Sequence, residues 1–255
     1  MRYFLRLAYN GTPFHGWQRQ PNASSVQETL EEALKIIIQK VTPLTGAGRT
    51  DTGVHAREMY AHFDVDFPIE NKEKFLLSLN RMTGRDITIY DLLPVVDDAH
   101  ARFDATGRTY RYYIRQREDP FTYGFSHFVK APLDIEKMNR AAARLLDVSD
   151  FTSFAKLHSD TKTNICDVRE AYWEIEETTG MVVFTISADR FLRNMVRAVV
   201  GTLMMVGLGK ITLEEFDDII KSKNRSNAGN SMPPQALFLE RIDYPETIYG
   251  CKNKN

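Results

Sequence analysis

The order of two hydrophobic periodicities is the feature that most constrains what this chain can fold into. Apolar side chains at every second position predict a strand over residues 3–9, and apolar side chains at helical spacing predict a helix that begins at Ser25 in a capping-box pattern. A strand over residues 59–67, a helix over 72–82 and a strand over 87–93 follow. This succession predicts a compact α+β unit in the first part of the chain.

The second part of the chain carries a similar set of elements. They are a strand over residues 106–116, a helix capped by Asp134, a hairpin around residues 178–180, an apolar helix over 191–206, a second capping box at Thr212 and Glu215, and a last strand over 236–244. We therefore expect a tandem of two α+β subdomains, one over residues 1–103 and one over 104–249, followed by a disordered tail over 250–255.

The composition is that of an ordinary folded protein, with 255 residues of which 43% are hydrophobic and 26% are charged. The formal net charge of −1 means that a nucleic-acid-binding function would need locally concentrated positive charge. Two distant cysteines exclude a disulfide framework, and no metal-binding histidine pattern occurs. The N-terminal segment is too short and too charged for a signal peptide, and no apolar run predicts a membrane span, so we expect a cytoplasmic location.

Residues 46–55 form the least ordinary segment of the sequence, with three glycines, Arg49, Asp51 and three hydroxyl or imidazole side chains. Glycines allow tight turns and the close approach of a ligand. The segment lacks the lysine of a Walker loop, and Asp51 stands where a dinucleotide fingerprint needs glycine or alanine. The spacing alone leaves two interpretations of Asp51 open, a turn residue that hydrogen-bonds its own backbone or a carboxylate with a chemical role.

Arginines and tyrosines alternate over residues 102–117, where five arginines stand against one acid, Asp104. Arginines that bind phosphates beside aromatic rings that stack on bases are typical of proteins that recognise looped RNA. The alternative is a solvated strand face whose tyrosines pack on the neighbouring layer. Three more arginines, Arg190, Arg193 and Arg197, are spaced along the predicted apolar helix, where each could be buried beside a carboxylate or could reach solvent.

Four segments together resemble the TruA family of tRNA pseudouridine synthases. Residues 48–56 are similar to the loop that carries the nucleophilic aspartate of that family, and residues 14–18 resemble its N-terminal loop. Residues 108–112 resemble its RxYRY strand, and residues 191–197 resemble its FLxxMVR helix. The four segments occur in the order that the family has, and the resemblance extends over nearly the whole chain.

The resemblance implies an α+β fold with two subdomains of mixed helix and antiparallel sheet, ferredoxin-like or RRM-like, that meet at a basic active-site cleft. It also implies isomerisation of uridine to pseudouridine in the anticodon stem-loop of tRNA, at positions 38, 39 and 40, by a homodimer that uses no cofactor and no metal. No partner other than tRNA and a second copy of the chain is expected, and no membrane.

The same resemblance implies a role for each candidate residue. Asp51 would be the nucleophile, attacking either C1′ of the sugar or C6 of the base, and Arg197 would keep its carboxylate ionised. Arg49 would contact a phosphate or help to splay the target nucleotide. Tyr110 would stack on the flipped uracil, and its hydroxyl is a candidate for removing the C5 proton.

Two other functions compete with this one. A non-catalytic RNA-binding module with RRM-like topology would explain the arginine–tyrosine strand but not the segment around Asp51, and the sequence lacks the RNP1 aromatic pattern. A phosphate-ester enzyme would use the glycine-rich segment but lacks the required lysine and metal ligands.

Overall fold

The computed structural model describes residues 1–156 and 162–249, which form two compact units. The first comprises Met1–Thr106 and the segment that begins at Leu239, and the second comprises Gly107–Phe238. The sequence predicts a boundary between residues 103 and 104, whereas the first unit here extends to Thr106 and also contains the segment from Leu239. The tail expected over residues 250–255 lies outside the described residues.

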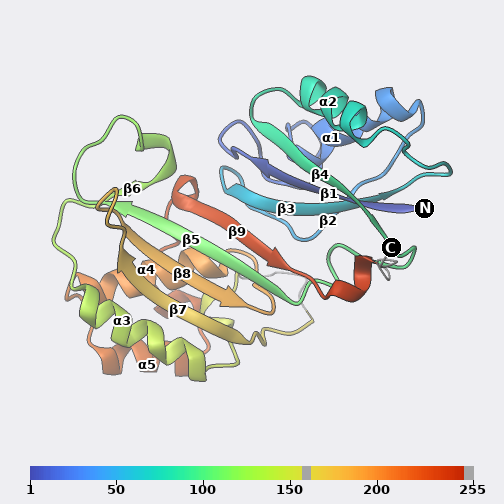
Figure 1. Ribbon diagram of the computed structural model, residues 1–255. Helices are drawn as coiled ribbons and strands as arrows, with labels where there is room; N and C mark the ends of the chain where they lie inside the picture. Colours follow the sequence, from blue (N-terminus) through green and yellow to red (C-terminus); the bar gives the residue numbers. More distant parts are fainter. Residues whose placement is uncertain (157–161, 250–255) are drawn as a thin grey trace. The chain divides into compact units, whose positions relative to one another are not determined.

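The first unit is a sheet covered by two helices on one face (Figure 1). Strands β4 (Ile87–Val95), β1 (Arg2–Tyr9) and β3 (His55–Asp64) are antiparallel neighbours in that order, and the short β2 (Thr45–Gly46) also pairs with β3. The helices are α1 (Val26–Ile38) and α2 (Lys72–Thr83). These elements confirm the predicted succession of strands and helices.

The alternation in residues 3–9 determines which face of β1 meets the helices. Its four residues on that face, Tyr3, Leu5, Leu7 and Tyr9, are all buried. Phe63 of β3 stacks on Phe75 of α2, with ring centroids 6.3 Å apart. Helix α1 begins after Ser25, whose hydroxyl accepts a hydrogen bond from Glu28 N at 3.3 Å, and ends where Gln39 adopts a left-handed conformation with φ 58°.

The second unit is a sheet with three helices on one face (Figure 1). Strands β5 (Gly107–Arg115), β8 (Val182–Ala188) and β7 (Val168–Ile175) are antiparallel neighbours, and β6 (His127–Phe128) pairs in parallel with the end of β5. The helices are α3 (Ile135–Arg144), α4 (Met195–Gly207) and α5 (Leu213–Lys221). Strand β9 (Leu237–Asp243) contains the boundary between the units.

The described residues also include six short 3-10 turns between or after these elements: Tyr123–Phe125, Leu145–Asp147, Thr152–Phe154, Arg225–Asn227, Pro234–Ala236 and Glu246–Tyr249. Helix α5 begins with the predicted capping box, since Thr212 Oγ1 accepts from Glu215 N at 3.2 Å and Thr212 N donates to the Glu215 carboxylate at 2.7 Å. This capping box fixes the residue at which the short helix α5 begins.

The apolar helix of the second unit begins later than the sequence predicts. It begins at Met195 rather than at residue 191, because Asn194 adopts a left-handed conformation with φ 65° that a continuous right-handed helix cannot contain. Phe191 and Arg193 therefore lie in the loop before the helix. Of the three arginines expected on one helix, only Arg197 lies in a helix. The prediction that all three share one helical face is therefore wrong.

Candidate active site

Two loops of the first unit are joined by backbone hydrogen bonds, and one of them carries Asp51. We call residues 46–55 the Asp51 loop and residues 10–24 the Trp17 loop. Trp17 N donates to Thr50 O at 3.3 Å, and Gly53 N donates to Phe14 O at 3.3 Å. The hydroxyls of Tyr9 and Thr50 share a hydrogen bond at 2.9 Å. Two of the four segments that carry the family resemblance are thus one structural element.

Three glycines allow these loops to approach each other closely. A Cβ atom on Gly11 would lie 2.1 Å from the carbonyl oxygen of Val54, and one on Gly16, which has φ +94°, would lie 2.4 Å from that of Thr50. A Cβ atom on Gly46 would lie 2.4 Å from the ring of Trp17, which is 2% exposed. All three distances are far below van der Waals contact, so the close approach requires glycine at each position.

His55 joins the end of the Asp51 loop to the start of the Trp17 loop. It is 1% exposed, and its Nδ1 accepts a hydrogen bond from Gly11 N at 3.0 Å. An accepting ring nitrogen carries no proton, so this contact requires neutral histidine with its proton on Nε2. Sequence reasoning gave His55 no role of its own, because nothing in the letters indicates that Gly11 lies beside it.

Asp51 lies at a turn of its loop, with its side chain half-buried. Val54 N donates to Asp51 O at 3.1 Å, and Gly53 takes φ 76° to complete the turn. Arg49, two residues before Asp51, and Thr52, directly after it, are exposed. This turn is closed by a hydrogen bond between backbone groups. Asp51 can therefore be a turn residue and still have a carboxylate with a chemical role.

In the second unit, Tyr110 of β5 has an aromatic neighbour that fixes the orientation of its ring. Tyr110 lies opposite Ile186 of β8 in the strand register. Its ring meets that of Phe191 edge to face, with centroids 5.1 Å apart and an interplanar angle of 87°. Such a pair is favourable and directional. Sequence reasoning did not assign this contact to Phe191, although both residues belong to segments that carry the resemblance.

The arginines of β5 do not form one solvated row. Arg115 is only 5% exposed, and its guanidinium donates to the carbonyl and hydroxyl oxygens of Ser126, both at 3.1 Å. Arg108 donates to Asp189 O at 2.7 Å, and Arg111 lies 3.9 Å from the carboxylate of Glu174. The interpretation of all these arginines as phosphate contacts is wrong for Arg115, because its buried guanidinium donates to Ser126 of the same unit.

Arg197 lies in the first turn of α4 and is tied to the chain that crosses this helix. Its Nε donates to Met232 O at 2.6 Å, and Met232 N donates back to Arg197 O at 3.1 Å. The hydroxyl of Tyr112 donates to the next carbonyl, that of Pro233, at 3.0 Å. Burial raises the pKa of Tyr112 and the positive charge of Arg197 opposes this rise, so the hydroxyl stays protonated and donates.

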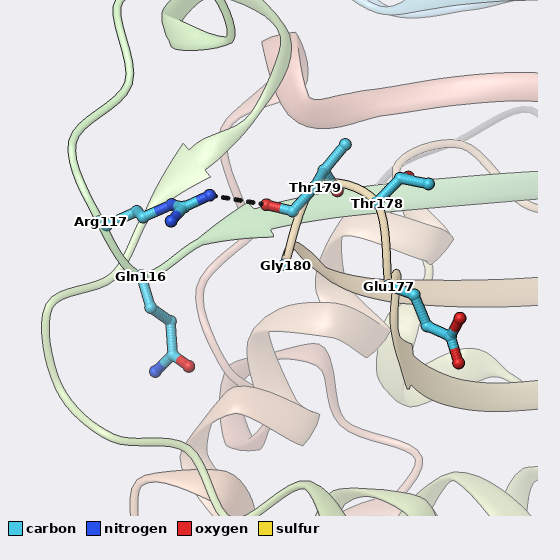
Figure 2. Close-up of a pocket in the computed structure, with 6 residues that line it drawn as sticks. All are labelled: Gln116, Arg117, Glu177, Thr178, Thr179 and Gly180. Atoms are coloured by element: carbon cyan, nitrogen blue, oxygen red, sulfur yellow. Dashed lines mark hydrogen bonds between the residues drawn. The ribbon is translucent and has the colours of Figure 1, made fainter.

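The four candidate residues are divided between the two units. Arg49 and Asp51 share one loop of the first unit, whereas Tyr110 and Arg197 belong to β5 and α4 of the second. The depression shown in Figure 2 is lined by none of them. It lies between the end of β5 and the β7–β8 turn, where Arg117 donates to Thr179 O at 3.4 Å.

Within residues 1–156 and 162–249, no three side chains among histidine, cysteine, aspartate and glutamate are grouped so that they could hold a metal ion. The same residues include no helix with the length and apolar character that crossing a membrane would require.

Comparison with known proteins decides the family. A family model described as tRNA pseudouridine synthase matches residues 141–245. A relative from Porphyromonas gingivalis, named tRNA pseudouridine synthase A, is 54% identical over 250 residues, which cover 97% of this chain and 99% of the relative. The chain belongs to the tRNA pseudouridine synthase A family. Relatives of the same name from Parabacteroides distasonis and Acetivibrio thermocellus are 51% and 41% identical, over 99% and 94% of this chain and 99% and 98% of their own lengths.

Membership in the tRNA pseudouridine synthase A family confirms the resemblance carried by residues 48–56 and the three other segments. It also confirms the α+β fold class and identifies the chain as an isomerase. A non-catalytic RNA-binding module and a phosphate-ester enzyme are therefore excluded.

Proposed function

We propose that this chain isomerises uridine to pseudouridine in the anticodon stem-loop of tRNA, at positions 38, 39 and 40, with Asp51 as the nucleophile. One observation carries the proposal. In a member of this family, backbone hydrogen bonds join the Trp17 loop to the Asp51 loop, and the Asp51 loop presents a half-buried carboxylate. Preorganised groups of this kind are what covalent catalysis needs. We place this reaction in the cytoplasm.

The chemistry requires nothing beyond acid, base and nucleophile. The bond between C1′ and N1 of uridine breaks, the uracil turns, and a bond forms between C1′ and C5. The proton on C5 is lost to solvent and N1 gains one, so atoms and electrons balance without a redox partner. Asp51 either displaces the base at C1′ or adds to C6, and both routes need an ionised carboxylate.

We assign the other candidate residues to the states before and after this attack. C5 is out of reach in a stacked base, so the target nucleotide must leave the stack, and Tyr110, oriented by Phe191, would stack on the flipped uracil. The exposed Arg49 would contact a phosphate beside the target. Arg197, which is anchored at Met232, would supply the positive charge that keeps Asp51 ionised.

The site of modification is tested by mapping. A tRNA transcript with uridines at positions 38, 39 and 40 is incubated with the protein, and pseudouridines are located by carbodiimide labelling and primer extension. We expect stops only at these positions, and their loss when each uridine is changed to cytidine. Modification confined to the D or T arm would contradict the proposed specificity and leave the isomerase assignment intact.

Replacing Tyr110 separates its two proposed roles. Tyr110→Phe keeps the ring and its contact with Phe191, so we expect normal tRNA binding and slow turnover if the hydroxyl helps to remove the C5 proton. Tyr110→Ala removes the stacking surface as well, which weakens binding by about 1–3 kcal/mol. Filter binding and single-turnover kinetics measure the two effects, and wild-type turnover by the Phe variant would remove the proton-transfer role.

We also propose that the chain acts as a homodimer, in which one protomer would bind the body of the tRNA while the other acts on the anticodon arm. Light scattering should then give twice the chain mass of 29.3 kDa at micromolar concentration. A monomeric mass in a preparation with full activity would contradict this.

A further inference from the structure

Arg225 braces a short segment of the second unit, residues 228–233, which we call the strap. Its terminal nitrogens donate to Gly229 O at 3.0 Å, to Ala228 O at 3.4 Å and to Ser231 Oγ at 3.0 Å. The side chain is half-buried, and burial lowers the pKa of its guanidinium. A partly buried cation that is committed to backbone and hydroxyl oxygens serves to hold a chain segment in place.

The strap lies directly on α4. Gly229 N donates to Thr202 Oγ1 of this helix at 2.9 Å, and a Cβ atom on Gly201 would lie 1.9 Å from Asn230 O. The Ser231 hydroxyl also accepts from Asn194 Nδ2, the residue whose left-handed conformation precedes the helix. Ser231 therefore receives two hydrogen bonds, one from Arg225 and one from the start of α4.

Within the strap, the backbone of Met232 exchanges two hydrogen bonds with Arg197. Arg197 Nε donates to Met232 O at 2.6 Å. A guanidinium is planar, so a fixed Nε–H bond determines the plane in which its terminal nitrogens lie. Displacing the Met232 carbonyl would rotate or shift that plane.

We propose that Arg225 and Ser231 are positioning residues for Arg197, holding the strap so that the Met232 carbonyl sets the plane of the Arg197 guanidinium. This inference rests on the proposed role of Arg197 toward Asp51. Neither residue needs to touch the substrate. If Arg225 instead contacted an RNA phosphate, its loss would weaken tRNA binding and lower the salt dependence of that binding.

A double-mutant cycle tests the inference, with Arg225→Gln made in the wild-type protein and in Arg197→Lys. Lysine has no Nε–H, so the coupling between the strap and residue 197 is already absent in the second background. We expect Arg225→Gln to lower kcat roughly tenfold to a hundredfold in the wild type, with an unchanged KM for tRNA, and to have little further effect beside Arg197→Lys. Ser231→Ala should act in the same direction but less strongly.

Arg140→Gln is the matched control, because Arg140 is an exposed arginine of the same unit whose partner is Glu136, 3.8 Å away. It should leave kcat unchanged. Thermal melts identify any variant that fails to fold, and Arg225→Lys, which retains the charge but not the branched donor, then replaces Arg225→Gln in the cycle.

Two results would overturn the inference. One is an equal loss of kcat from Arg225→Gln in both backgrounds, which is what a general structural role predicts. The other is a raised KM at normal kcat, which indicates phosphate contact. Wild-type turnover by Arg197→Lys and Arg197→Met would instead contradict the proposed role of Arg197 itself, so failure of the inference and failure of the proposed function are distinguishable.

Discussion

Asp51→Asn is expected to fold and bind tRNA like the wild type, yet to form no pseudouridine. Asparagine keeps the size of the side chain and the turn made by Asp51 O and Val54 N, but it has no anionic oxygen with which to attack carbon. It also removes a negative charge that would face RNA phosphates, so binding should be unchanged or tighter. Release of tritium from C5-labelled uridine measures turnover, and filter binding at fixed salt measures affinity.

Asp66→Asn provides the matched control, because Asp66 is an exposed carboxylate of the same unit that pairs with Lys40 at 2.6 Å. It should have normal turnover. Turnover by Asp51→Asn above a trace, once mass spectrometry has excluded deamidation, would show that Asp51 is only a turn residue. Loss of tRNA binding together with activity would indicate a structural role instead.

Arg197→Met is expected to lose roughly a hundredfold to a thousandfold in kcat, the usual effect of removing one preorganised group that stabilises charge in an active site. Methionine keeps an unbranched apolar stem but offers no donor to Met232 O. Arg197→Lys restores the charge without the planar fork, so it should recover only part of the loss. Single-turnover kinetics with saturating protein measure all three forms.

Arg144→Met is the control for this series, because Arg144 is an exposed arginine of α3 that lies 3.9 Å from the carboxylate of Asp217. Its turnover should be normal. The rate of Arg197→Met should also recover partly as pH rises, if the lost charge had been keeping a carboxylate ionised. A wild-type rate and pH profile in Arg197→Met would identify Arg197 as a residue that serves only to hold the strap.

Local signals in the sequence predicted most of the secondary structure. The alternation in residues 3–9, the serine cap of α1 and the capping box of α5 depend on neighbours within four positions, so they can be recognised in the letters. The start of α4 could not be predicted in this way. Asn194 adopts a left-handed conformation and contacts Ser231, which is far along the chain. The spacing of apolar residues carries no information about this contact.

Sequence motifs identify the candidate site residues, whereas the contacts that hold those residues in place are tertiary. No pattern in the letters predicts the contacts of Gly11 N with His55 Nδ1, of Phe191 with the Tyr110 ring, or of Met232 O with Arg197. The burial of Arg115 escaped sequence reasoning for the same reason, because the strand pattern cannot show that Ser126 turns back onto it. Such contacts depend on how distant segments pack, which only the folded chain reveals.

The most direct test of the proposed reaction is release of tritium from tRNA whose uridines carry the label at C5. The purified chain, with no added cofactor and with chelator present, should release tritium until each target uridine has given up one label. The same tRNA with cytidine at positions 38, 39 and 40 should release none. No release from the unmodified sequence, under conditions in which the chain binds that tRNA, would contradict the account.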